Sequence, residues 1–94
     1  MIEMVKNSLE KHGLTGYVFG DDFLEFKGVI GNIDIEGSVE INSDEKEIAY
    51  SISFYDIEKD YEIMTDANTR SNINESNIDE TIEYIITPSF ANCC

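Results

Sequence analysis

Apolar and polar residues alternate one-for-one through the centre of the chain, over residues 33–42. The isoleucines and the valine of this segment share one parity, and the acidic and other polar residues share the other. Alternation with a period of two is typical of a β-strand that buries one face. Residues 48–55 alternate in the same way, and the short polar connection at 42–47 predicts that the two strands pair antiparallel. The face expected to be buried contains Ile33, Ile35, Val39, Ile41, Ile48, Tyr50, Ile52 and Phe54.

Shorter segments on both sides of this pair predict further elements. Residues 17–19 and 23–27 are rich in aromatic and aliphatic side chains, and the glycine and aspartates between them predict a turn. Residues 56–64 fit both a helix and a strand, and a strand is slightly favoured. Gly37 continues the alternation in phase, which predicts a bend or a bulge there. Residues 65–77 are rich in asparagine and poor in large apolar residues, so we expect an exposed loop.

Two amphipathic helices are predicted near the ends of the chain. Apolar residues recur at helical spacing over residues 2–12, and Gly13 supplies a stop signal. Isoleucines recur at the same spacing over residues 77–87, after a capping pattern formed by Ser76 and Asp79. The sequence therefore predicts an α+β fold in which a three- or four-stranded antiparallel meander packs on one side against an N-terminal and a C-terminal helix.

Length and charge narrow the function classes. The 94 residues form a single domain (1–94) with room for one modest core. Twenty acidic and six basic residues give a formal charge of −14, which repels nucleic acid and anionic membranes and favours a basic protein partner. The sequence begins without a secretory signal, and no segment approaches the roughly 18 apolar residues of a membrane span, so we expect a cytoplasmic protein. Abundant isoleucine and asparagine indicate an AT-rich bacterial or phage genome.

The acidic residues are concentrated, because ten of the twenty carboxylates fall between Asp34 and Glu62. Alternate carboxylates on one strand face lie roughly 6.6 Å apart and approximate a row of phosphates. Such rows can occupy a Lys/Arg groove that another protein keeps for nucleic acid. The alternatives are a solubilising face that blunts an edge strand, or the general acidity of a halophile. Tyr55 joins the set because tyrosines are frequent interface hot spots and it shares parity with exposed serines. The predicted partner-binding residues are Asp34, Glu36, Glu40, Asp44, Glu45, Glu47, Tyr55, Asp56, Glu58, Asp60, Glu62, Asp79, Glu80 and Glu83.

Catalytic and cofactor motifs are missing from the sequence. The only histidine is His12 and the only cysteines are Cys93 and Cys94, so no Ser-His-Asp or Cys-His arrangement can be built. There is no glycine-rich phosphate loop, and the acids at positions 21 and 22 are explained by turn chemistry. The spacing of His12 and the terminal cysteines does not match a zinc site. We therefore expect no enzymatic activity, cofactor or metal.

In size and charge, the whole chain resembles the small acidic phage-encoded inhibitors of host defence, which include anti-CRISPR proteins and other DNA mimics. The resemblance carries no sequence motif and transfers no residue role. It implies a non-catalytic protein that binds a nucleic-acid-binding effector, such as a Cas nuclease or its guide complex, and blocks DNA binding in a bacterial host cell. The alternative is a small acidic protein-binding module, because the predicted element order also resembles secretion chaperones and toxin-immunity proteins. The sequence leaves open whether the protein is a monomer or a dimer.

Overall fold

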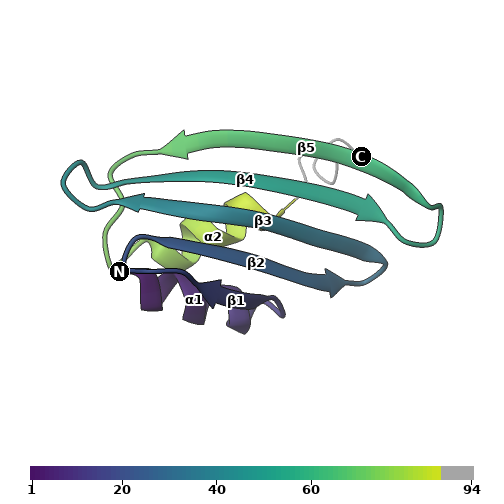
Figure 1. Cartoon of the computed structure of the whole chain (residues 1–94), viewed down its shortest axis with the longest axis horizontal. Coiled ribbons are helices and arrows are strands. Elements are labelled where there is room, and N and C mark those ends of the chain that lie inside the picture. Colours follow the sequence, from purple (N-terminus) through teal and green to yellow (C-terminus); the bar gives the residue numbers. More distant parts are fainter. Residues whose placement is uncertain (88–94) are drawn as a thin grey trace.

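The computed structural model describes residues 1–87, which form one five-stranded sheet and two helices (Figure 1). The strands lie in chain order and each pairs antiparallel with the next. Both helices lie on the same side of the sheet. The predicted α+β fold with a meander and two terminal helices is confirmed, but the meander has five strands and not three or four. The elements are α1 (Ile2–Lys11), β1 (Thr15–Val18), β2 (Phe23–Ile30), β3 (Ile33–Asn42), β4 (Glu47–Asp56), β5 (Tyr61–Arg70) and α2 (Ile78–Ile86).

The additional strand corrects the prediction of a loop over residues 65–77. Residues 65–70 belong to β5, which pairs with β4 from Ile48↔Arg70 to Asp56↔Tyr61. The strand lies at the edge of the sheet, and only Ile63 and Met64 are half-buried in it. An edge strand that buries neither face needs no alternating apolar residues, so the period-two signal is absent although the backbone is extended.

The central β3–β4 pair follows the predicted register. Ten consecutive pairs run from Ile33↔Asp56 to Asn42↔Glu47 without interruption. The prediction that Gly37 bends the strand or forms a bulge is wrong for the bulge, because pairing continues through it on both sides. The register shift lies instead between Phe54 and Tyr55, where β4 pairs with β5.

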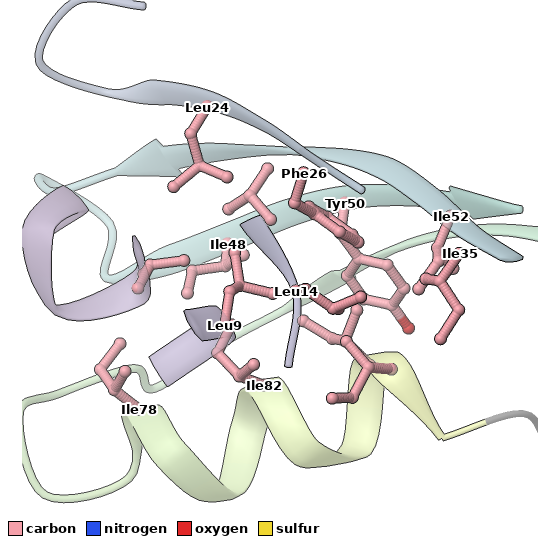
Figure 2. Packing of buried hydrophobic residues seen from close by; sticks show 14 of the residues in the cluster. Leu9, Leu14, Leu24, Phe26, Ile35, Ile48, Tyr50, Ile52, Ile78 and Ile82 are labelled. Atoms are coloured by element: carbon pink, nitrogen blue, oxygen red, sulfur yellow. The ribbon is translucent and has the colours of Figure 1, made fainter. Parts of the chain in front are cut away.

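The core lies between the sheet and the helices. Seven of the eight residues predicted to face it are buried, and Ile33 is half-buried against the same cluster. Figure 2 shows Leu9 of α1 and Ile78 and Ile82 of α2 near the side chains of the sheet. Burying a side chain of this size stabilises a fold by about 1.5–3 kcal/mol. Among residues 1–87, no helix is long and apolar enough to cross a membrane.

The start of α2 differs from its prediction. The N-cap residue is Asn77, whose side chain makes no capping hydrogen bond within the described chain. The Ser76 hydroxyl donates to Asn74, and the Asp79 carboxylate accepts hydrogen bonds from Ser8 and Lys11 of α1, each 2.6 Å long. The capping pattern of Ser76 and Asp79 is therefore not formed, because Asp79 connects the two helices.

Candidate functional site

No helix or strand of residues 1–87 covers the side of the sheet opposite the helices, and we call this side the open face (Figure 1). Side chains that lie opposite each other on paired strands share a face, so the registers assign its members. The row through the sheet centre contains Lys27, Glu36, Ser53 and Thr65. The acidic residues of the open face are Glu25, Asp34, Glu36, Glu40, Glu47 and Glu62.

The open face has little compensating positive charge. It contains six carboxylates and one lysine, which give it a formal charge of −5. That residue, Lys27, lies opposite Glu36, and its ammonium is 5.8 Å from the centre of the Tyr17 ring. The salt bridges within residues 1–87 are Lys6–Glu10 and Lys11–Asp79, and both involve α1. No salt bridge of the described chain therefore neutralises the open face.

The centre of the open face is a shallow depression of about 690 Å³. Ser38 and Ser51, which are paired small residues of β3 and β4, line it. Tyr17 and Phe23 also line it, from the β1 and β2 side. Small side chains between larger ones leave this hollow, so the surface of the sheet is accessible here.

Four of the predicted residues lie in turns at the two ends of the sheet. Asp44 and Glu45 are in the exposed turn between β3 and β4, and Glu58 and Asp60 are in the exposed turn between β4 and β5. The pKa of Glu47 is raised, chiefly by a hydrogen bond with the carboxyl group of Glu45. Desolvation and the like charge of Glu45 raise it further. Carboxyl groups crowded in this way favour the approach of a cation.

Tyr55 is on the open face, as predicted, with 36% of its surface exposed. Its hydroxyl donates a hydrogen bond to Asp60, which raises the pKa of Tyr55. The ring is therefore held next to an acidic turn, which is a favourable arrangement for contact with Arg or Lys.

Asp56 lies on the helix side of the sheet and not on the open face. It pairs with Ile33, retains 8% exposure, and accepts a hydrogen bond of 2.9 Å from the backbone N–H of Lys59. The carboxylate closes the β4–β5 turn, so the structure places Asp56 apart from the predicted partner-binding residues of the open face.

The three predicted acids of α2 also lie on the helix side. Asp79 is paired within the chain, and the hydrogen bonds from Lys11 and Ser8 lower its pKa. Glu80 and Glu83 line a separate groove of about 610 Å³ beside β5. Of the predicted set, the structure brings together on the open face Asp34, Glu36, Glu40, Glu47, Tyr55 and Glu62.

Glu25, Lys27 and Tyr17 lie on the open face but are not among the predicted partner-binding residues, although Tyr17 was considered as an interface anchor. The signal for Glu25 was present, because it lies between Leu24 and Phe26, which are both buried. The four-residue strand β1 shows too little alternation to assign Tyr17 to a face.

The described residues contain no group of three or more His, Cys, Asp or Glu side chains that could hold a metal ion. Cys93 and Cys94 lie outside the described residues. The chain matches no protein-family model, no curated protein and no solved structure.

Proposed function

We propose that this protein is a non-catalytic inhibitor that binds the basic nucleic-acid-binding groove of a nuclease or its guide complex and blocks DNA binding, in the manner of an anti-CRISPR protein or DNA mimic. One observation carries the proposal: the open face holds six carboxylates and one lysine, without a salt bridge in the described chain and without a covering helix. Charges exposed in this way attract a basic surface and repel nucleic acid.

The spacing of the carboxylates supports a partner whose basic groove binds the phosphates of nucleic acid. Asp34, Glu36 and Glu40 follow one strand, where alternate positions are about 6.6 Å apart. This distance is about twice the 3.4 Å rise per nucleotide of one DNA strand. A Lys/Arg groove arranged for a phosphate backbone can therefore contact several of these carboxylates together, with the same release of counterions.

The aromatic residues of the open face support a contact with protein. Tyr17 and Tyr55 are 46% and 36% exposed, and they lie on β1 and β4 with the acidic strand β3 between them in the sheet order. Tyrosine rings accept guanidinium and ammonium groups on their faces, and tyrosine and arginine are enriched at interface hot spots. The acids then steer the encounter, and the rings add contact area at close range.

The test is competition with target DNA. A guide-loaded Cas nuclease is titrated with the protein in a gel shift at low and high salt, and we expect salt-sensitive loss of DNA binding. The triple variant Glu36→Lys, Glu40→Lys, Glu47→Lys should bind the nuclease at least about a hundredfold more weakly, because each reversed charge costs on the order of 1 kcal/mol against a basic surface.

A matched control places the same charge change on the helix side. Glu3→Lys, Glu10→Lys, Glu75→Lys also brings the net charge from −14 to about −8, but none of these residues is on the open face. The control should retain most of the inhibition. Equal affinity of the two triple variants would refute a role for the open face, and no inhibition by the unmodified protein at micromolar excess would favour a chaperone or immunity role.

A further inference from the structure

The outer edge of β5 has no neighbouring strand within the described chain, whereas the other edge of the sheet is the four-residue strand β1 (Figure 1). We propose that β5 pairs antiparallel with β5 of a second copy, so that two molecules form one continuous sheet around a two-fold axis. The proposal is independent of the proposed function, because it concerns a different part of the molecule and needs no nuclease.

The backbone hydrogen bonds show which residues of β5 point outward. Along an antiparallel strand, the N–H and C=O groups of successive residues point alternately to the two neighbours. Ile57 N–H bonds to Asn32 C=O at 3.0 Å, so the pairs that follow at steps of two, such as Asp34↔Tyr55, are the hydrogen-bonded pairs between β3 and β4. The even-numbered residues of β4 therefore direct their backbone groups toward β5.

The same alternation then fixes β5. Ile52 and Tyr50 are even-numbered, and they pair with Asp66 and Asn68. Consequently the odd-numbered residues Thr65, Ala67 and Thr69 direct their N–H and C=O groups to the free edge. One hydrogen bond agrees with this assignment: the Thr69 N–H is bonded to the Asn68 side-chain oxygen at 2.8 Å and not to β4, and a second copy would take the place of that side chain.

Residues 64–70 of β5 have few of the features that prevent an edge strand from pairing with a strand of another molecule. Residues 61–70 contain neither proline nor lysine, and the register shift opposite Phe54/Tyr55 leaves residues 64–70 regularly paired. Prolines, lysines and bulges are the usual means by which edge strands avoid other strands. The side chains of Thr65, Ala67 and Thr69 are small and do not obstruct a neighbouring strand.

Charge complementarity selects one register for two copies. Outward-pointing residues must pair with each other, and a two-fold axis at Asn68 pairs Ala67 with Thr69 of the second copy. The same register places Asp66 opposite Arg70 of the second copy, and does so twice by symmetry. Moving the axis to Ala67 would place Asp66 opposite Asn68 and leave Arg70 opposite Met64, so the charged pairs would be lost.

The side chains of the charged pairs are on suitable faces. Asp66 and Arg70 both pair with core-facing residues of β4, so both lie on the helix side of β5. The Arg70 guanidinium is held 4.3 Å from the centre of the Tyr84 ring of α2. Residues directly opposite in a non-hydrogen-bonded pair have Cβ atoms about 4.5–5.5 Å apart, which is within reach of a salt bridge.

The dimer joins the two open faces. A two-fold axis between antiparallel strands is perpendicular to the sheet, so both acidic faces lie on the same side of a sheet twice as wide. Each copy has a charge of −14, and the resulting repulsion weakens association at low ionic strength. We therefore expect the dimer to form more readily as salt is added.

Sedimentation velocity of the 94-residue chain at 0.5 M NaCl, at concentrations up to about 1 mM, tests the proposal. The unmodified protein should form a concentration-dependent dimer. Asp66→Arg places arginines opposite each other and Arg70→Asp places aspartates opposite each other, so each variant should dimerise at least about tenfold more weakly. The double variant exchanges the two charges and should return to within about threefold of the unmodified protein, because opposite charges again face each other.

A proline variant tests the hydrogen bonds separately. Ala67→Pro removes an N–H that points to the free edge and leaves the β4–β5 hydrogen bonds in place, so it should abolish the dimer with an unchanged far-UV circular dichroism spectrum. A monomer at all concentrations and salt levels, or a double variant that is no better than the single ones, would overturn the proposal. Because no nuclease is present, these results do not depend on whether the open face inhibits one.

Discussion

Replacing Gly37 with alanine should lower the free energy of unfolding more than any other Gly→Ala change in a strand of this protein. A Cβ atom at Gly37 would lie 2.3 Å from the carbonyl oxygen of Ser51 and 2.6 Å from Cζ of Phe26. Real Cβ atoms essentially never approach another heavy atom within 3.0 Å. The Ser51 oxygen belongs to the backbone of β4, so the new methyl group must separate two central strands as well as displace a buried ring.

The expected loss is about 3–4 kcal/mol in the free energy of unfolding. Inserting a methyl group into a tightly packed region costs roughly 1–3 kcal/mol, and each weakened hydrogen bond of the β3–β4 pair adds about 1 kcal/mol. A domain of 94 residues has a total stability of about 5–14 kcal/mol. Gly37→Ala should therefore lower Tm by roughly 12 °C or more.

Urea unfolding followed by far-UV circular dichroism measures this loss, because the chain contains no tryptophan. Gly28→Ala is the matched control. Its Cβ would lie 2.8 Å from Cδ2 of the buried Leu14, but its nearest backbone atom, the Gly13 oxygen, is 3.1 Å away and not 2.3 Å, so we expect a smaller loss of about 1–2 kcal/mol. If Gly37→Ala lost no more stability than Gly28→Ala, the close contact between Gly37 and the backbone of β4 would be refuted.

Two further predictions concern acids that the structure places off the open face. The pKa of Asp79 is lowered in the fold, chiefly by the hydrogen bond with Lys11. The ionised carboxylate therefore stabilises the protein at pH values above 3.8, the ordinary pKa of aspartate, and this stabilisation is lost as the pH falls. Asp79→Asn should lower Tm at pH 7, and the difference should shrink below pH 3.8 in thermal melts; a difference independent of pH would contradict the ionic contribution. Asp56→Ala should cost about 1 kcal/mol in urea unfolding, because the Lys59 N–H loses its acceptor, and should leave inhibition unchanged. Weaker inhibition by this variant with an intact fold would return Asp56 to the partner-binding set.

The parts of the fold that were predictable are those that bury one face. Alternation over residues 33–42 and 48–55 gave the β3–β4 pair, because a strand between core and solvent needs apolar residues at every second position. The same rule contained a signal for Asp56, which shares its parity with Phe54 and lies on the core side. The edge strand β5 was not predicted over residues 65–70, since exposure on both faces removes the pattern.

Most of the candidate site was among the residues predicted from the sequence, but their common face was a local property only along one strand. Asp34, Glu36 and Glu40 share parity along β3, so their common face is a local property of the sequence. Glu62 was predicted and Glu25 was not, but the order and register of the strands were needed to place both on the same face as these three acids. The exclusion of Asp79 from the site could not be predicted, because its counterion Lys11 in α1 is 68 residues away in the sequence.

By itself, the sequence determined the acidity of the protein, the two amphipathic helices and the central alternating strands, because charge, helical spacing and period-two burial are local properties of the chain. The tertiary structure decided which acids form one uncovered surface and which are paired within the fold. It also decided that β5 is the last strand of the described sheet, with one edge that no other described strand pairs with. These properties depend on strand order and on the packing of both helices on one side, which bring together residues that no local pattern connects.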